Sequence, residues 1–260
     1  KGVSKMITVK LKGGLGNQMF QYALGRKLSL KRKAILKLDK TLLQWSIRQM
    51  IIGTTAREYE LGEFNIKAEF TKDKGNSYLE GFWQGEEYFK DIRRILLKDF
   101  TLKKETQNFL KLKRLVVKTN SASIHFRRGD YVKRAVTGKY HGVLNFDYYR
   151  KAIELVGEKI KNPHFFVFSD DIAWVKKNFR IKQPVTYISG SGKLTNPEEL
   201  ILMACCRHNI IANSSFSWWG AWLNRNRQKI VLAPKRWFRK KRAESGIVPQ
   251  TWIKVENDFS

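Results

Sequence analysis

Two adjacent arginines, Arg127 and Arg128, stand in the stretch IHFRRGDYV, between an apolar run and a glycine. Guanidinium groups match phosphate oxygens in a bidentate way and keep their charge when partly desolvated. Successive side chains of a regular strand point to opposite faces, so one arginine faces a given cleft unless the turn at Gly129 relaxes the backbone. The pattern favours phosphate binding by both arginines, or by one of them while the other pairs with Asp130 to hold the loop.

Polar residues on either side of apolar runs offer groups that could hold a base or sugar. A neutral His125 imidazole could form such a hydrogen bond, or be a satisfied histidine of the core. After FFVFS, Asp170 or Asp171 could accept hydrogen bonds from the N–H groups of guanine. The same residues could instead begin the next helix, with Ser169 or Asp170 fitting an N-cap well. Both roles can hold, one residue each.

Two more polar clusters precede expected helices. GGLGNQ, residues 13–18, lets the backbone approach a ligand at a helix N-terminus, where N–H groups attract anions, or is only a structural turn. It matches neither the dinucleotide fingerprint nor the P-loop. In NSSFSWWGAW, Ser214 and Ser215 would suit a diphosphate. The tryptophans that follow have helical spacing, which is more typical of core than of ligand stacking; they are Trp218, Trp219 and Trp222.

The sequence alternates between predicted strands and helices, and each of these polar clusters lies at the end of a predicted strand. The pattern predicts a strand followed by a turn within residues 6–14, a helix from 17 and a strand at 34–40, with a second series of strands and helices from about residue 123. Such alternation with short connections is typical of α/β folds with parallel sheets, where ligands gather at the carboxyl ends of strands. We expect two halves, residues 1–120 and 121–260.

The composition points to an acidic partner. The chain has 260 residues and a formal net charge of +28, with 42% hydrophobic residues, enough for a buried core. Cys205 and Cys206 are neighbours, which predicts free thiols in a reducing compartment. The four histidines lack tight metal spacing, so we expect no catalytic metal and no cofactor. Neither a transmembrane stretch nor a signal-peptide pattern is apparent, which predicts a cytoplasmic protein.

The segment KRWFRKKR, residues 235–242, joins six cations with two aromatic residues. It could touch an anionic membrane surface, or be an ordinary solvated basic surface. A basic nucleic-acid-binding protein would explain the charge, but no recognised nucleic-acid module is present and the polar clusters would have no role. A sugar-nucleotide-binding protein without transfer activity is a second alternative. We expect no nucleic acid partner.

Several motifs together resemble the bacterial-type α-1,2-fucosyltransferases of glycosyltransferase family eleven, in family order from residue 7 to about 238. They are GGLGNQMFQYA, YLEGFWQGEEYF, IHFRRGDYV, FFVFSDDIAWVK and HNIIANSSFSWWGAWLN. The resemblance implies an α/β fold of the glycosyltransferase-B type, with two Rossmann-like domains facing a cleft. It also implies metal-independent, inverting transfer of L-fucose from GDP-β-L-fucose. The acceptor would be the 2-hydroxyl of a galactose-terminated glycan, which could be lipid-linked at the inner membrane.

The resemblance also distributes roles. The half 121–260 would hold the nucleotide, and 1–120 would help to shape the acceptor cleft. Arg127 and Arg128 would stabilise the leaving GDP, and Asp130 is the nearest candidate base, with Glu86 and Glu87 as weaker ones. The expected donor-binding residues are Gly14, Gly16, Asn17, Gln18, His125, Arg127, Arg128, Asp170, Ser214, Ser215 and Phe216. Segment 41–70 and the stretch SGSGKLTNPEELILMACC depart from the family pattern, so the acceptor is not specified.

Overall fold

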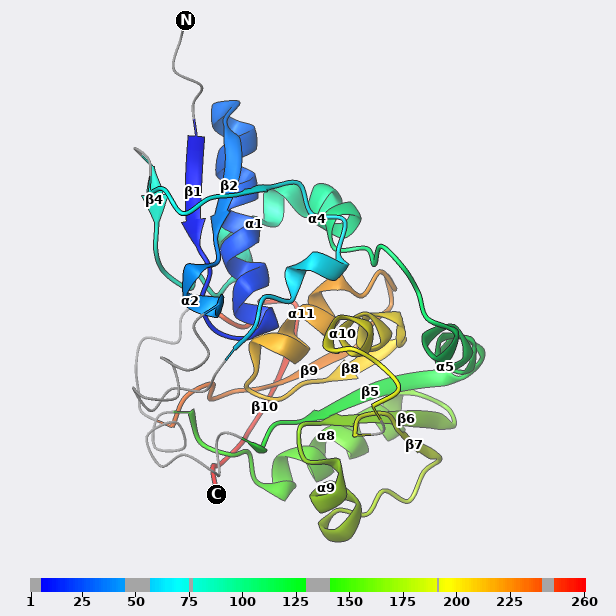
Figure 1. Ribbon diagram of the computed structural model, residues 1–260. Helices are drawn as coiled ribbons and strands as arrows, with labels where there is room; N and C mark the ends of the chain where they lie inside the picture. The colour runs from blue at the N-terminus through cyan, green and yellow to red at the C-terminus, as the bar shows by residue number, and fades with distance from the viewer. Residues whose placement is uncertain (1–5, 45–56, 75–76, 130–140, 191, 240–245) are drawn as a thin grey trace, which may run out of the picture. The chain divides into compact units, whose positions relative to one another are not determined.

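The computed structural model describes residues 6–44, 57–74, 77–129, 141–190, 192–239 and 246–260. The chain divides into two compact units, Lys1–Lys104 and Glu105–Ser260, and each contains one parallel β-sheet (Figure 1). The predicted α/β fold class is confirmed, since each unit combines a parallel sheet with helices.

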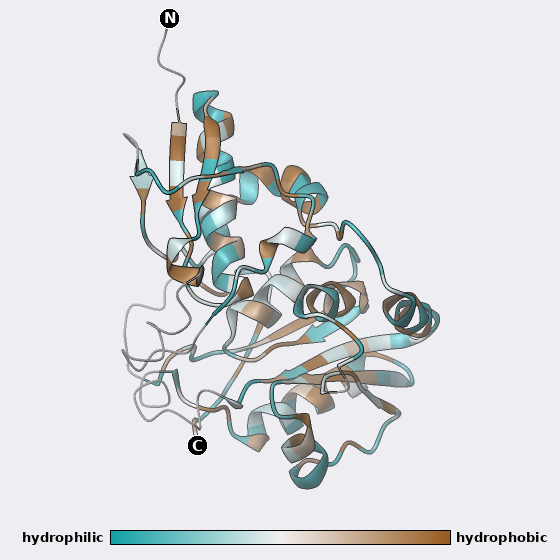
Figure 2. Ribbon diagram, in the orientation of Figure 1, coloured by the Kyte–Doolittle hydropathy of each residue, from teal (hydrophilic) through white to brown (hydrophobic). Residues whose placement is uncertain are grey.

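The first unit is built on a four-stranded sheet of order β3-β2-β1-β4. Its strands and helices are β1 (Met6–Lys10), α1 (Leu15–Arg32), β2 (Ile35–Asp39), α2 (Thr41–Gln44), β3 (Glu69–Phe70), β4 (Tyr78–Leu79) and α4 (Arg93–Asp99). Short 3-10 helices at Leu61–Glu63, Glu86–Tyr88 and Lys90–Ile92 join them. Apolar residues, brown in Figure 2, line β1, whose Ile7 and Val9 are buried.

The second unit is built on a six-stranded sheet of order β10-β9-β8-β5-β6-β7. Its strands are β5 (Asn120–Phe126), β6 (Pro163–Ser169), β7 (Val185–Tyr187), β8 (His208–Ile210), β9 (Val231–Pro234) and β10 (Ile253–Val255). Its helices are α5 (Gln107–Lys118), α8 (Phe146–Lys159), α9 (Ile172–Asn178), α10 (Asn196–Cys205) and α11 (Ser215–Leu223).

Local sequence chemistry fixes several helix starts in the second unit. Asn145 caps α8 by accepting a hydrogen bond from the Tyr148 backbone N–H, as predicted. Thr195 and Glu198 form a capping box at the start of α10, and Pro197 occupies its first turn. Such caps satisfy N–H groups that have no partner within the helix, so each helix begins at a defined residue after its strand.

The boundary between the units lies before α5, whereas the sequence placed it near residue 120. The polar segment 101–118 resembles a linker, but Phe109 and Val116 of α5 are fully buried. Helix α5 packs against α10 and β5, both in the second unit. Burial of one apolar stripe therefore joins α5 to the second sheet.

Candidate functional site

The carboxyl edge of the second sheet gathers most of the predicted polar residues. The chain proceeds from β5 to β6 and β7 on one side, and β8, β9 and β10 lie on the other side of β5 (Figure 1). Ligands of open parallel sheets bind where the strand order reverses in this way. Register aligns Phe126 with Ser169 and Ile124 with Ile210, so the segments that follow β5, β6 and β8 meet at one edge.

Asp170, after β6, holds the turn that follows β5. Its Oδ2 lies 2.8 Å from Arg127 Nη1, and its Oδ1 accepts a hydrogen bond of 2.9 Å from the Arg128 backbone N–H. A Cβ at Gly129 would come within 2.7 Å of Asp170 Oδ2, so a larger residue would displace the carboxylate. Burial alone raises the pKa of Asp170, but Arg127 and the backbone N–H groups of Gly129 and Arg128 outweigh it, and the pKa is lowered. The carboxylate is therefore ionised at neutral pH.

Arg128 is positioned by an aromatic ring. Its guanidinium carbon lies 3.7 Å from the centre of the Trp174 ring, and its Nε lies 3.5 Å from Asp171 Oδ2. Stacking on an aromatic face leaves the edges of a guanidinium oriented for hydrogen bonding. A role for Trp174 was not predicted from the sequence. An aromatic residue in the first turn of the helix after SDD could have indicated it.

The N-cap of α9 is Asp171, which corrects the expectation of Ser169 or Asp170. Asp171 Oδ1 accepts a hydrogen bond of 3.3 Å from the Trp174 backbone N–H. Ser169 is buried and its Oγ accepts a hydrogen bond of 3.0 Å from the Asp171 backbone N–H, while Asp170 is held by Arg127. Since both are engaged elsewhere, Asp171 is left to cap the helix.

His125 is a neutral, buried residue next to this turn. Its ring centre lies 5.7 Å from that of Phe216 at the start of α11. The end of β5 therefore lies next to the start of α11, where Ser214 and Ser215 are found. Burial lowers the pKa of His125 to about 3; Asp170 opposes this shift and Arg127 reinforces it. Its Nδ1 is buried and has no hydrogen-bond partner within the described residues. His125 therefore offers hydrogen bonding but no charge at neutral pH.

The buried His125 should make stability depend on pH. Its folded pKa lies below the unfolded value of about 6.5, so the unfolded state binds more protons between pH 6.5 and 3 and stability falls as pH drops. Between pH 7 and pH 5 this residue should cost about 2 kcal/mol of unfolding free energy. Urea unfolding at both values should show a correspondingly smaller decrease for His125→Phe. Equal decreases in the two proteins would contradict a neutral buried histidine.

The N-terminus of α11 completes this edge. Ser214 caps the helix by accepting a bond of 3.4 Å from the Phe216 backbone N–H, and Ser215 is its first residue. The Asn213 amide donates to the carbonyls of His141, Gly142 and Trp237, which fixes the preceding loop. Three tryptophans of α11 are buried as predicted: Trp218, Trp219 and Trp222. Their burial anchors the helix whose first-turn N–H groups lie beside the serines.

In the first unit, the glycine-rich turn follows β1 and leads into α1. Gly13 has a φ of +81°, a conformation that favours glycine, and Gly14 is the N-cap. The Asn17 side chain accepts a hydrogen bond of 2.8 Å from Gln84. Gln18 is fully buried and bonds to the carbonyls of Gly13 and Glu58 and to the Glu60 N–H, so its amide supports the turn from within. Gly16 is also buried.

A comparison with protein families decides the class of protein. The model described as glycosyl transferase family 11 matches residues 1–256. The chain belongs to this family. The match confirms the resemblance stated above, and the protein is a glycosyltransferase.

Proteins similar to this chain are named for the transfer of different sugars. An α-1,2-colitosyltransferase of Escherichia coli is 33% identical over 96% of this chain and 99% of its own length. The O-antigen biosynthesis glycosyltransferase WbnK of Escherichia coli is 30% identical, covering 94% and 99%. Galactoside 2-α-L-fucosyltransferase SEC1 of Bos taurus is 29% identical, covering 84% and 64%.

Solved glycosyltransferase structures are more distant. NodZ α-1,6-fucosyltransferase soaked with GDP-fucose aligns with a TM-score of 0.46 and 11% identity, over 85% of this chain and 93% of that one. A glycosyl transferase of family 9 from Veillonella parvula aligns with a TM-score of 0.49 and 10% identity, over 100% and 89%.

The candidate bases are not equally placed. Asp130 lies outside the described residues, and so do Lys240 to Arg242 of the basic segment. Glu86 and Glu87 begin a 3-10 helix of the first unit, where Glu86 is half-buried and the exposed Glu87 forms an ion pair of 2.6 Å with Lys90. Among the described residues, no three His, Cys, Asp or Glu side chains cluster in a way that could hold a metal ion. No helix in the described ranges is long and apolar enough to cross a membrane.

Proposed function

We propose that this family 11 glycosyltransferase moves L-fucose from GDP-β-L-fucose to the 2-hydroxyl of a galactose-terminated glycan. The transfer would invert the configuration at the anomeric carbon and need no metal ion. The name of the bovine relative supports the transferred sugar and the linkage. A lipid-linked acceptor at an anionic membrane surface belongs to the same proposal.

The observation that carries this proposal is the pair of arginines at the strand-order reversal of the second sheet. Departure of GDP leaves negative charge on the diphosphate, which fixed positive groups must stabilise where no metal does so. Arg128 is oriented by Trp174, and Arg127 by Asp170. The N-terminus of α11, with Ser214 and Ser215, lies after the adjacent strand and adds a favourable dipole.

Colitosyl transfer is the second candidate, because the colitosyltransferase is similar over nearly the whole of both chains. Colitose is fucose without the 3-hydroxyl group, so the two donors share their nucleotide and most of their sugar. A site that hydrogen-bonds the 3-hydroxyl would reject the colitose donor, whereas an apolar contact there would not. The polar residues at the carboxyl edge would contact the nucleotide, so they do not distinguish the fucose donor from the colitose donor.

A donor comparison tests the proposal. Transfer from GDP-fucose and GDP-colitose is measured on a panel of galactose-terminated acceptors, with and without a chelator. We expect kcat/KM for GDP-fucose to exceed that for GDP-colitose by at least about tenfold, with no effect of the chelator. A preference for GDP-colitose would overturn the fucosyl assignment and leave the family assignment intact. Binding of GDP without transfer to any acceptor would favour a binding protein.

A further inference from the structure

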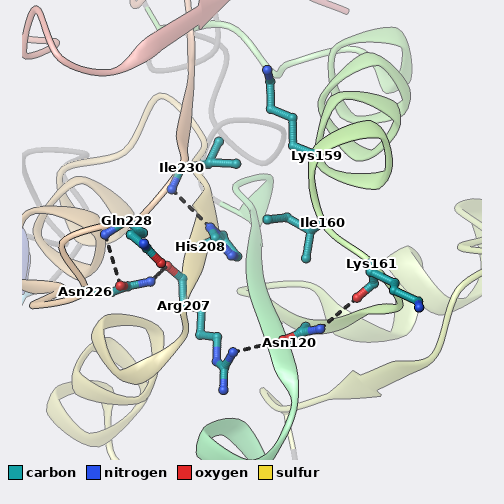
Figure 3. Close-up of a pocket in the computed structure, with 9 residues that line it drawn as sticks. All are labelled: Asn120, Lys159, Ile160, Lys161, Arg207, His208, Asn226, Gln228 and Ile230. Carbon is teal, nitrogen blue, oxygen red and sulfur yellow. Dashed lines mark hydrogen bonds between the residues drawn. The ribbon is translucent and has the colours of Figure 1, made fainter.

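A cavity of about 520 Å³ opens at the amino ends of the strands of the second sheet, the edge opposite the candidate donor site. It lies beside the first residues of β5 and β8, with Asn120 and His208 among its lining residues. In Figure 3, Lys159 and Lys161 stand on one side of the His208 ring, and Arg207 lies on the other. Its volume falls within the range of small-molecule sites, about 300–1,000 Å³.

The lining of the cavity is cationic. It includes Lys159, Lys161 and Arg207 and no carboxylate. Within the described part of the chain, none of these three cations has a carboxylate at ion-pair distance. The predicted basic segment differs, because Lys235 pairs with Glu256 and Arg236 pairs with Asp258. The cavity therefore has positive charge that no carboxylate of the described residues neutralises at ion-pair distance.

The polar groups of the lining are held in place before any ligand binds. Arg207 Nη1 donates to Asn120 Oδ1 over 2.9 Å, and Asn120 Nδ2 donates to the Lys161 carbonyl over 2.7 Å. Asn226 Nδ2 donates to the Arg207 carbonyl over 3.0 Å. These bonds link both sides of the cavity (Figure 3), so a ligand would meet an ordered surface.

His208 supplies a neutral donor at the centre of the cavity. Its Nδ1 accepts a hydrogen bond of 3.1 Å from the Ile230 backbone N–H, which places the ring proton on Nε2. Burial lowers the pKa of His208, and Arg207 lowers it further, so the ring is uncharged at neutral pH. Within the described residues Nε2 has no hydrogen-bond partner. Its N–H is therefore available to an acceptor oxygen.

Helix dipoles alone do not account for the charge at this edge. Lys159 ends α8 and complements the negative end of the helix dipole. Lys161 and Arg207 lie beyond their helices, in the connections to β6 and β8. The described helix-to-strand connections of the sheet contain no Asp or Glu. They carry further cations at Arg180, Lys182, Arg225 and Arg227. This charge favours an anionic ligand at the whole edge.

We propose that the cavity binds a phosphate group of an anionic ligand, at a second site separate from the candidate donor site. Lys159, Lys161 and Arg207 would face the phosphate charge, and the Nε2–H of His208 would donate to one of its oxygens. The phosphate could belong to a soluble anion or to a lipid headgroup, because both offer the same oxygens.

The test uses the full chain and two probes. Sodium pyrophosphate is titrated while NMR follows the ring of His208 and the indole N–H of Trp174, which report separately on the two sites. In parallel, the chain is sedimented with phosphatidylcholine vesicles, with or without phosphatidic acid. The variant is Lys159→Gln/Lys161→Gln, in which both lysines are exposed. Its matched control, Lys31→Gln/Lys177→Gln, removes two exposed lysines from the ends of α1 and α9.

We expect pyrophosphate to shift the His208 ring, and the variant to weaken this response about tenfold while the Trp174 response stays unchanged. Transfer to a small soluble acceptor should keep the wild-type rate. Binding to phosphatidic acid vesicles that the variant weakens would assign the phosphate to a lipid headgroup, and no vesicle binding would assign it to a soluble anion. The absence of a His208 shift with pyrophosphate, together with vesicle binding that the variant does not weaken, would overturn the proposal. Equal weakening in the control would also overturn it.

Discussion

Replacing Arg128 with lysine is expected to lower the turnover of glycosyl transfer by about 10²–10³-fold, without unfolding the protein. The substitution keeps the positive charge but loses the flat guanidinium that lies 3.7 Å from the Trp174 ring. A lysine ammonium cannot present two parallel N–H groups to a diphosphate. Because charge on the diphosphate grows as the donor bond breaks, kcat should fall more than GDP affinity.

Arg150→Lys is the matched control for this experiment. Arg150 is an exposed arginine of α8 that forms an ion pair of 2.9 Å with Asp147 and lies 5.7 Å from the Phe146 ring. It offers the same types of contact away from the sheet edge, so its variant should keep wild-type kcat. If Arg128→Lys retains both turnover and GDP affinity, Arg128 has no part in holding the diphosphate.

The parts of the fold that sequence alone predicted are those specified by local chemistry. Strand β6 is a largely apolar run that ends at Ser169, and strand β5 ends at Phe126 just before the paired arginines; each is almost wholly buried. Strands β3 and β10 were missed because they have two and three residues and little apolar pattern. Their pairing depends on neighbouring strands, which a short stretch of sequence does not encode.

The same division holds at the candidate site. Parallel strands bring their carboxyl ends together, so the gathering of Arg127, Asp170 and Ser214 at one edge followed from the order of elements. The pairing of particular side chains did not follow. Asp130 was one candidate partner of an arginine and lies outside the described residues, whereas Asp170, which the register of β5 and β6 brings next to Arg127, was not predicted as its partner. Such contacts depend on positions in space that residue spacing leaves open.

Asp170 is the second residue whose replacement should have a large effect. Asp170→Asn is expected to lower the unfolding free energy by about 1–3 kcal/mol, because the ion pair with Arg127 is lost and the turn N–H groups lose a charged acceptor. Its side chain is 25% exposed, so solvent screens the pair only in part. Since the pKa of Asp170 is lowered, the wild-type contribution is present above about pH 4 and is lost as pH falls through the folded pKa.

Asp170 was one of two residues predicted to accept hydrogen bonds from guanine, and that role can be separated from its support of the turn. Inosine diphosphate lacks the 2-amino group of GDP, so a carboxylate that reads guanine should discriminate between the two. If Asp170 supports the turn, Asp170→Asn should weaken both nucleotides equally while stability falls. Asp147→Asn, whose carboxylate is 66% exposed in its pair with Arg150, should change stability by less than about 0.5 kcal/mol. Unchanged stability in Asp170→Asn, with affinity lost for GDP alone, would assign Asp170 to the base.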